Sequence, residues 1–298
     1  RLISGDVERA PFSEFALTAD EIKAGLVLAC RSVPWEDIEI AWLGEDEFIA
    51  HPIRHMICRV AALDDMTHDI KRIRMEIQSG GPFRFSAGQY CSLSFAGQKS
   101  RDYSMANTPD EPILEFHIRH VPDGASSEYV AQSLAIGEEV MAEGPFGSSW
   151  LREAHRGPII ALAGGSGLAP IKSMVERALF LGMVQDINLY FGVREERDLY
   201  LEDHFDNLKK SHSNLKFVPV LSEGGSAVRS TERRTGLVDE AVATDFADLD
   251  GFKAYLAGPP PMVEAATTML LDRGARREDI YADAFYTEED KPILENRR

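Results

Sequence analysis

The chain has 298 residues, of which 44% are hydrophobic and 27% charged, the balance of an ordinary globular protein with more than one domain. Asp and Glu number 49 against 32 Lys and Arg, which gives a formal net charge of −17. This acidic balance disfavours nucleic acid and anionic membranes as partners, because both attract basic surfaces. No apolar run is long enough to span a bilayer.

Three cysteines occur in the chain, Cys30, Cys58 and Cys91. A small and odd number argues against a disulfide scaffold and favours a reducing compartment, so we expect a cytoplasmic protein. Cys58 and Cys91 fall in predicted strands, where thiols are usually inert parts of a core.

Residues 1–45 form the first predicted part, which is short and acidic. Residues 1–50 carry 11 Asp and Glu against 4 Lys and Arg, a net charge of −7. Two interpretations stay open for this charge. It is either a solvated surface or a docking face for a redox partner, which would mainly raise the association rate.

Residues 51–150 form the second part, which is rich in strand signals. Residues 56–63 and 70–77 predict strands, and Leu114–Arg119 alternates apolar and polar side chains as a half-buried strand does. Turn markers such as Ser79-Gly80-Gly81-Pro82 separate these runs. Many short strands of this kind indicate an antiparallel barrel.

Residues 157–298 form the third part, in which strand and helix patterns alternate. Helical spacing of apolar side chains, as from Ile171 to Leu179, separates compact apolar runs at 158–163, 187–191, 215–221 and 252–256. Buried runs that alternate with amphipathic helices indicate a doubly wound parallel sheet. Ligands of such sheets bind at the carboxyl ends of the strands.

Three short motifs follow one another along these two parts. They are Arg101-Asp102-Tyr103-Ser104, Gly164-Gly165-Ser166-Gly167-Leu168-Ala169-Pro170 and Ala257-Gly258-Pro259-Pro260-Pro261-Met262. The second follows a predicted strand and opens a helix, with Pro170 well suited to a first helical turn, which is the context that a dinucleotide site requires. At these separations the motifs resemble the flavin and nicotinamide sites of the ferredoxin–NADP reductase superfamily.

The nearest resemblance is to the NADH-dependent reductase components of bacterial aromatic-ring dioxygenases, of the naphthalene or salicylate type. It implies three units: a partial plant-type ferredoxin segment of α+β type, a six-stranded antiparallel flavin-binding barrel, and a doubly wound α/β nucleotide-binding domain. It also implies an electron-transport enzyme of aromatic hydrocarbon catabolism.

In the barrel, the resemblance implies that FAD is bound by the Arg101–Ser104 strand. Arg101 would hold the pyrophosphate through its planar donor fork, Tyr103 would pack on the isoalloxazine, and Ser104 would bond near N5. A predicted helix that starts near Ser126 and runs through Leu134 would offer its N-terminus to phosphate. Gly124 and Ser127 favour FAD over FMN. The other expected cofactor-contacting positions are Asp102, His117, Ile118, Arg119 and Ser126. A structural role is the alternative for His117, because redox flavin chemistry needs no general base.

In the third part, the resemblance implies NAD(H) contacts from the glycine loop, namely Gly165, Gly167, Leu168, Ala169 and Pro170. Further contacts are expected from Gly192, Arg194, Gly258, Pro259, Pro260 and Met262. The strand at 217–221 ends in Ser222-Glu223. A carboxylate at Glu223 would repel a 2′-phosphate and accept from ribose hydroxyls, which favours NADH over NADPH. Alternatively, Arg229, Arg233 and Arg234 could reach back from the following loop.

Two features near the nicotinamide complete the expected site. Ala257 stands where the family usually has Cys, which puts any thiol contribution in doubt. Asp283 resembles the family's terminal acid, and Phe285 or Tyr286 would shield the flavin ring. The expected catalytic residues are Tyr103, Ser104, Asp283 and Phe285. Simple core packing is the alternative for each aromatic residue.

Around Cys30, residues 26–34 resemble the segment at the fourth cysteine of plant-type [2Fe–2S] ferredoxins. Cys30 is then the expected cluster ligand, with the other three expected upstream of residue 1. The alternative is a degenerate domain in which Cys30 is only a buried thiol.

The implied mechanism passes a hydride from NADH to FAD and then single electrons through the cluster to a ferredoxin or terminal oxygenase component. Two other functions remain open: a flavin reductase without an iron–sulfur centre, and a non-catalytic flavoprotein subunit that docks on a partner.

Overall fold

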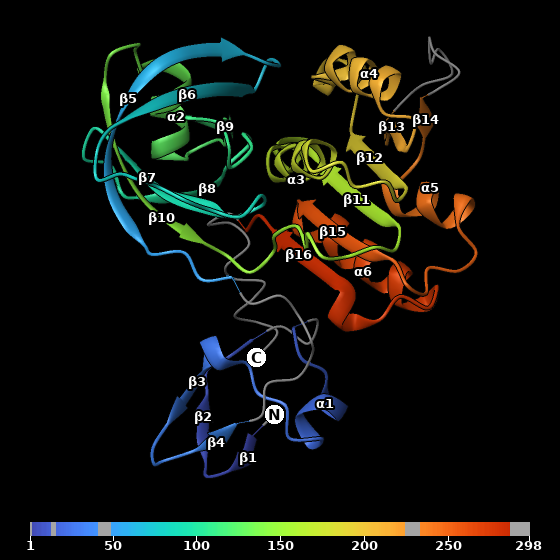
Figure 1. Cartoon of the computed structure of the whole chain (residues 1–298). Helices are drawn as coiled ribbons and strands as arrows, with labels where there is room; N and C mark the ends of the chain where they lie inside the picture. Colours follow the sequence, from blue (N-terminus) through green and yellow to red (C-terminus); the bar gives the residue numbers. More distant parts are fainter. Residues whose placement is uncertain (1, 13–15, 41–48, 224–232, 287–298) are drawn as a thin grey trace. The chain divides into compact units, whose positions relative to one another are not determined.

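The computed structural model describes residues 2–12, 16–40, 49–223 and 233–286 (Figure 1). The chain divides into a small unit, residues 1–47 with 286–298, and a large unit, residues 48–285. Among the described residues, no helix has both the length and the apolar character needed to cross a membrane.

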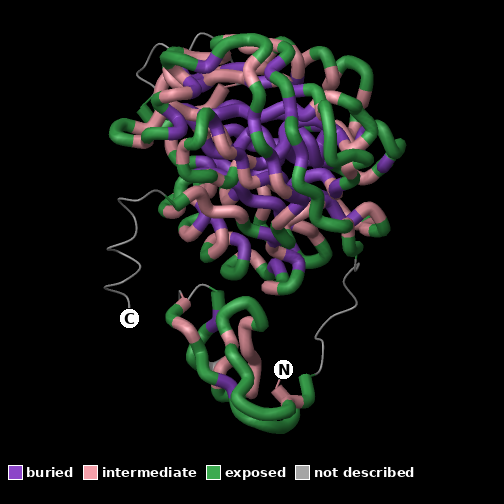
Figure 2. Tube along the Cα trace, turned by 90° about the vertical axis from the view of Figure 1, so that its left-hand side faces the viewer, coloured by how far each residue is buried: buried purple, intermediate pink, exposed green. Residues whose placement is uncertain are grey.

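The small unit consists of short elements with little buried surface. Strand β1 (Leu2–Ser4) pairs with β4 (Glu39–Ile40), and β2 (Val7–Arg9) pairs with β3 (Ser32–Pro34). Helix α1 (Ala19–Lys23) and the 3₁₀ turn η1 (Ala29–Arg31) complete it. Only Val7 and Leu17 among its described residues are buried, and Figure 2 shows most of its trace exposed or half-buried.

The first half of the large unit is an antiparallel barrel that confirms the predicted six strands. They are β5 (Arg54–Asp65), β6 (Ile70–Ser79), β7 (Tyr90–Phe95), β8 (Arg101–Ser104), β9 (Ile113–Arg119) and β10 (Glu139–Phe146). Their order is β8-β7-β10-β5-β6-β9, and a bridge between Met105 and Phe116 joins the two edges. The barrel is therefore nearly closed.

Alternate side chains of these strands fill the barrel, as period-2 patterning requires. Cys58 and Cys91 lie in this core with no exposed surface, as the sequence predicted, and burial raises the pKa of Cys58 to about 11. Helix α2 (Ala125–Gln132) follows β9. It ends earlier than expected, and Leu134 packs in the barrel core from the segment beyond it.

The second half of the large unit confirms the predicted parallel sheet. Its strands are β11 (Ile159–Gly164), β12 (Ile187–Val193), β13 (Leu215–Leu221), β14 (Arg234–Thr235), β15 (Lys253–Gly258) and β16 (Ile280–Ala284), in the order β14-β13-β12-β11-β15-β16. All neighbouring pairs are parallel.

Helices cover both faces of this sheet (Figure 1). Side chains of α3 (Leu168–Phe180) and α4 (Glu202–Ser211) belong to one apolar cluster, and those of α5 (Val238–Asp245) and α6 (Pro260–Asp272) belong to another. The 3₁₀ turns η2 (Gly165–Gly167), η3 (Glu196–Asp198) and η4 (Arg277–Asp279) join elements of the domain. The strand order reverses between β11 and β15, where ligands of doubly wound sheets bind.

Candidate functional site

Strand β8 presents the predicted flavin residues on alternate sides. Arg101 and Tyr103 share one side, and Asp102 and Ser104 share the other, because side chains alternate along a strand. The half-buried ring of Tyr103 lies edge-on to Phe95 with centroids 6.3 Å apart. Burial raises the pKa of Tyr103 to about 12, so its phenol stays neutral near pH 7.

Ser104 and Asp283 meet although 179 residues separate them in the sequence. The Ser104 hydroxyl donates to Asp283 Oδ2 over 3.2 Å, which joins the last residue of β8 to β16. Burial raises the pKa of Asp283 to about 6, against the lowering effect of the Ser104 hydrogen bond, and the nearby charge of Asp102 adds to the rise. The pair therefore holds or releases a proton close to neutral pH.

Glycines in the loop between β11 and α3 allow the backbone of β15 to come close. A Cβ on Gly167 would lie 2.1 Å from the carbonyl oxygen of Ala257, so any side chain there would displace backbone. A Cβ on Gly258, whose φ is +147°, would lie 2.9 Å from the carbonyl oxygen of Gly164. The loop and the Ala257–Gly258 turn therefore need glycine for close packing, which explains part of both motifs.

A pocket of about 200 Å³ opens beside this loop at the carboxyl ends of β11, β12 and β13. Several residues that the sequence singled out lie together in its wall, whereas Glu223 does not line it and lies exposed beside the lining residue Ser222. The lining residues are Asp69, Ile70, Arg119, Gly164, Gly165, Gly192, Val193, Arg194, Asp198, Val220, Ser222, Gly236, Leu237, Val238, Pro259 and Met262.

The barrel contributes Asp69 and Arg119 to this pocket. Arg119 Nε donates to Asp69 Oδ2 over 2.7 Å. Burial raises the pKa of Asp69, but its hydrogen bond with Thr67 and the charge of Arg119 outweigh burial and lower it. Sequence reasoning missed Asp69, because its place depends on the β6–β9 register, which sets Ile70 opposite Arg119.

Helix α2 begins at Ala125, close to the predicted start. Its serine hydroxyls are engaged within the protein: Ser126 donates to the carbonyl of Lys99 over 3.0 Å, and Ser127 donates to that of Gly124 over 3.0 Å. The first intrahelical bond comes from Glu128 N–H, which leaves earlier amides without an intrahelical acceptor. A phosphate would therefore meet backbone amides here rather than serine side chains.

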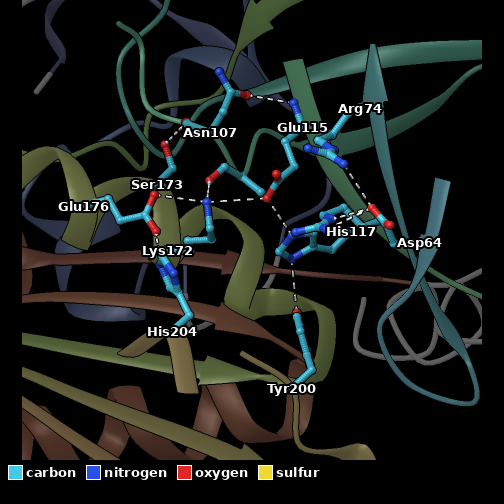
Figure 3. A network of polar contacts seen from close by, with 12 residues as sticks. Asp64, Arg74, Asn107, Glu115, His117, Lys172, Ser173, Glu176, Tyr200 and His204 are labelled. Carbon is cyan, nitrogen blue, oxygen red and sulfur yellow. Dashed lines mark hydrogen bonds and ion pairs between the residues drawn. The ribbon is translucent and has the colours of Figure 1, made fainter. Parts of the chain in front are cut away.

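The side chain of His117, for which a structural role is the alternative, lies inside the protein. Its side chain has no exposed surface and lies between Glu115 and Tyr200 (Figure 3). Because β9 is buried on both sides here and Glu115 and Tyr200 enclose the ring, any cofactor contact at this position would be made by its backbone. Ile118 is equally buried, at 1% exposure, whereas Arg119 reaches the pocket.

The other predicted contacts lie around the glycine loop. Leu168, Ala169 and Pro170 form the buried first turn of α3, and Pro260 opens α6. Phe285 N–H donates to the carbonyl of Gly258 over 2.9 Å, which places this aromatic residue directly after the Asp283 strand. Tyr286 is 46% exposed.

Two arginines considered as 2′-phosphate ligands have acidic partners instead. Arg233 pairs with Glu196 and Glu202, and Arg234 pairs with Asp245. Arg229 lies outside the described residues.

Cys30 is exposed in η1. Among the described residues, no group of three or more His, Cys, Asp and Glu side chains is arranged to hold a metal ion. One thiolate is a quarter of the ligand set of a [2Fe–2S] cluster, so these residues alone do not form a cluster site.

Comparisons with known proteins agree with this geometry. Residues 57–150 match the oxidoreductase FAD-binding domain, and residues 161–268 match the oxidoreductase NAD-binding domain. The chain is 42% identical over 260 residues to the ferredoxin–NAD(P)⁺ reductase component of a naphthalene 1,2-dioxygenase system from Pseudomonas putida, covering 87% of this chain and 78% of the relative.

Two further matches extend this likeness. The corresponding component of naphthalene 1,2-dioxygenase and salicylate 5-hydroxylase systems from Ralstonia sp. is 42% identical, over 89% of this chain and 79% of the relative. The crystal structure of a cytochrome P450 reductase from Amycolatopsis superposes with a TM-score of 0.77 at 32% identity, over 96% of this chain and 86% of that one.

The raised pKa of Asp283 predicts how stability changes with pH. Between the unfolded value of 3.8 and the folded value of about 6, the folded state binds more protons, so the free energy of unfolding falls as pH rises through this window. Asp283→Asn lacks the titrating carboxyl, so this fall in the free energy of unfolding is absent from the variant. We expect the stability advantage of Asp283→Asn over wild type to grow by on the order of 1 kcal/mol from pH 5.0 to 7.5.

Urea unfolding of both flavin-free proteins at the two pH values measures this difference. Asp102→Asn, which removes the neighbouring charge but keeps the Asp283 carboxyl, should retain most of the pH dependence. If Asp283→Asn differs from wild type in its free energy of unfolding by the same amount at both pH values, the raised pKa of Asp283 is contradicted.

Proposed function

Because the chain belongs to the ferredoxin–NAD(P)⁺ reductase family of FAD- and NAD-binding oxidoreductases, we propose that it is the reductase component of an aromatic-ring oxygenase system. It takes a hydride from NADH and passes electrons singly to a ferredoxin or oxygenase partner. The observation that carries this proposal is the meeting of Ser104 with Asp283, beside a glycine-lined pocket to which barrel and sheet both contribute.

The residues around β8 fit FAD by their chemistry. Arg101 offers a planar donor fork for pyrophosphate, and the amides at the start of α2 offer unpaired donors for phosphate oxygens. Tyr103 supplies a neutral aromatic face for a flat ring. When bound, FAD supplies a ring atom that accepts hydride and later gives up electrons one at a time.

Ser104 and Asp283 are the groups that can hold a proton where hydride arrives. With its pKa at about 6, Asp283 is partly protonated near neutral pH, and the Ser104 hydroxyl lies between its carboxylate and β8. We assign Asp283 the role of proton holder and Ser104 the role of hydrogen-bonding partner. Phe285, one position after β16, is proposed to cover the ring until nicotinamide takes its place.

NADH is assigned to the pocket beside Gly165. The glycine loop and the start of α3 present backbone to a pyrophosphate, and Gly192 and Met262 form the apolar wall. Glu223 lies next to the lining residue Ser222 at the end of β13, and its carboxylate disfavours a 2′-phosphate there. The pairing of Arg233 and Arg234 with acidic side chains supports the same preference.

We further propose that Cys30 is one ligand of a [2Fe–2S] centre that accepts electrons from the flavin. Its support is the sequence around Cys30 and the exposure of this thiol in η1. The proposal needs three more cysteine ligands, which these 298 residues do not supply, because the other two cysteines are buried in the barrel core. Iron and acid-labile sulfide analysis of the full-length gene product separates it from a flavin reductase without a cluster.

An anaerobic absorbance titration with NADH and then NADPH tests the function. We expect the flavin bands to bleach at lower NADH than NADPH, together with broad iron–sulfur absorbance. Bleaching of flavin alone would favour the flavin reductase. Failure of NADH to bleach bound flavin would reject the enzyme and leave a docking flavoprotein.

We expect Arg101→Ala to bind FAD about 10- to 100-fold more weakly, because charge-assisted hydrogen bonds contribute roughly 1.5–3 kcal/mol. The check is the dissociation constant of FAD, measured from the quenching of FAD fluorescence when FAD is added back to the flavin-free protein. Arg59→Ala, an exposed arginine on β5, is the control and should bind FAD as wild type does. Unchanged affinity in Arg101→Ala would contradict its assignment.

We expect Glu223→Arg to shift the ratio of kcat/KM values about tenfold toward NADPH, since it replaces repulsion of a 2′-phosphate by attraction, and a tenfold change corresponds to about 1.4 kcal/mol. Glu139→Arg makes the same charge change at an exposed position of β10 and should leave the ratio unaltered. Equal shifts in both variants would indicate a general charge effect and reject Glu223 as selector.

A further inference from the structure

A buried polar network joins the barrel to the nucleotide-binding domain (Figure 3). Its centre is Lys172 of α3, whose side chain is 9% exposed. Lys172 Nζ donates to the carbonyl of Ala106 over 3.0 Å and to Glu176 Oε2 over 3.0 Å, and it lies 3.4 Å from Glu115 Oε1. Three acceptors from two domains thus surround one ammonium group.

The protonation of this network follows from its partners. Burial raises the pKa of Glu115, but the hydrogen bond with His117 and the charge of Lys172 outweigh it and lower the pKa to about 2. An ionised carboxylate only accepts, so His117 Nε2, 3.0 Å from Glu115 Oε1, carries a hydrogen. Burial lowers the pKa of His117, which leaves its Nδ1 as an acceptor.

Tyr200 continues the network from His117 to the glycine loop. Its hydroxyl lies 3.3 Å from His117 Nδ1 and 3.3 Å from the carbonyl oxygen of Gly165. The ring is 4% exposed and lies edge-on to His117 and to Phe191, with centroids 5.4 and 5.5 Å away. Its single hydrogen is therefore shared between one acceptor from β9 of the barrel and one from η2.

Gly165, where this polar network ends, belongs to the wall of the ligand pocket. Gly165 lines the pocket and has a left-handed φ of +54°, which glycine adopts without steric cost. Its carbonyl accepts two hydrogen bonds, one from the Leu168 N–H within η2 and one from the Tyr200 hydroxyl. In a trans peptide the carbonyl and the following N–H point in opposite directions. A hydrogen bond that holds the Gly165 carbonyl toward Tyr200 therefore turns the amide N–H of Ser166 to the other side.

We propose that Tyr200 is a positioning residue for the bound dinucleotide. From its place against His117 of the barrel, its hydroxyl adds to the Leu168 N–H in holding the Gly165–Ser166 peptide in the orientation that receives the ligand. The inference rests on the proposed use of this pocket for NAD(H). Tyr200 contacts the loop and does not line the pocket, so loss of its hydroxyl should weaken binding of substrate and transition state equally, which raises KM and leaves kcat unchanged.

Tyr200→Phe tests the proposal, because it keeps the ring and removes the hydroxyl. We expect the dissociation constant of NAD⁺ and the KM of NADH to rise about fivefold, the usual effect of one neutral hydrogen bond. The values of kcat and FAD content should stay within twofold of wild type. NAD⁺ binding is followed by calorimetry and NADH oxidation by a dye-linked assay.

Tyr190→Phe is the matched control. Tyr190 is fully buried on β12, and its hydroxyl donates to Asp245 on the other face of the same sheet. It should keep the NAD⁺ affinity of wild type. An unchanged dissociation constant in Tyr200→Phe, or an equal loss in both variants, would overturn the positioning role. Inability of the wild type to oxidise NADH would instead reject the proposed function.

Amide hydrogen exchange on the wild-type holoprotein provides a test that needs no variant. Addition of NAD⁺ should slow exchange at Ser166 and its loop neighbours more than at the loop after β13. Exchange at Ser166 that NAD⁺ leaves unaltered would contradict the proposed orientation, whether or not Tyr200→Phe folds well.

Discussion

The ammonium group of Lys172 is the contact on which the arrangement of the two halves of the large unit depends. Burying a charge costs several kcal/mol unless it is paired and hydrogen-bonded, and removal of one partner leaves the other uncompensated. Lys172 meets this requirement with a carbonyl and a carboxylate from the barrel and with Glu176 of its own helix. Ser173 adds a hydrogen bond of 2.6 Å to the carbonyl of Asn107. If the barrel and the sheet separated, these charged groups would lose their partners. The network therefore favours a single arrangement of the two halves.

Close backbone packing is the second constraint, and it acts within the nucleotide-binding domain. Gly167 lies against Ala257, and Gly258 lies against Gly164, at distances that exclude any Cβ. The loop after β11 is thereby fixed on the β15 side by sterics, and on the barrel side by the hydroxyl of Tyr200. These two supports act on neighbouring peptides, so the pocket wall is defined by packing as well as by polar contacts.

The sequence predicted the barrel, the parallel sheet and the glycine loop, because each depends on local patterning: alternation in β9, apolar runs in β11 and β12, and glycine before a helix. It did not predict Asp69 in the pocket or the partners that surround the buried His117. Both depend on strand register and on which side of β9 faces α3, and local periodicity does not encode such long-range contacts. Lys172 was missed for a similar reason, since a lysine in an amphipathic helix usually lies at the surface.

Carboxylates at the domain boundary differ in environment, and this difference separates their roles. Glu115 and Asp69 are held ionised by cationic or hydrogen-bonding partners, so both keep a fixed charge across the neutral range. Asp283 has a hydroxyl as its partner and another carboxylate nearby, and burial raises its pKa to about 6. When the environments of carboxyl groups give them different pKa values, the groups suit different roles: one that stays ionised serves structure, and one that titrates near neutral pH can transfer a proton. Among these three, Asp283 is therefore the carboxyl whose protonation changes near neutral pH, which is the property that its proposed role requires, whereas Glu115 and Asp69 stay ionised.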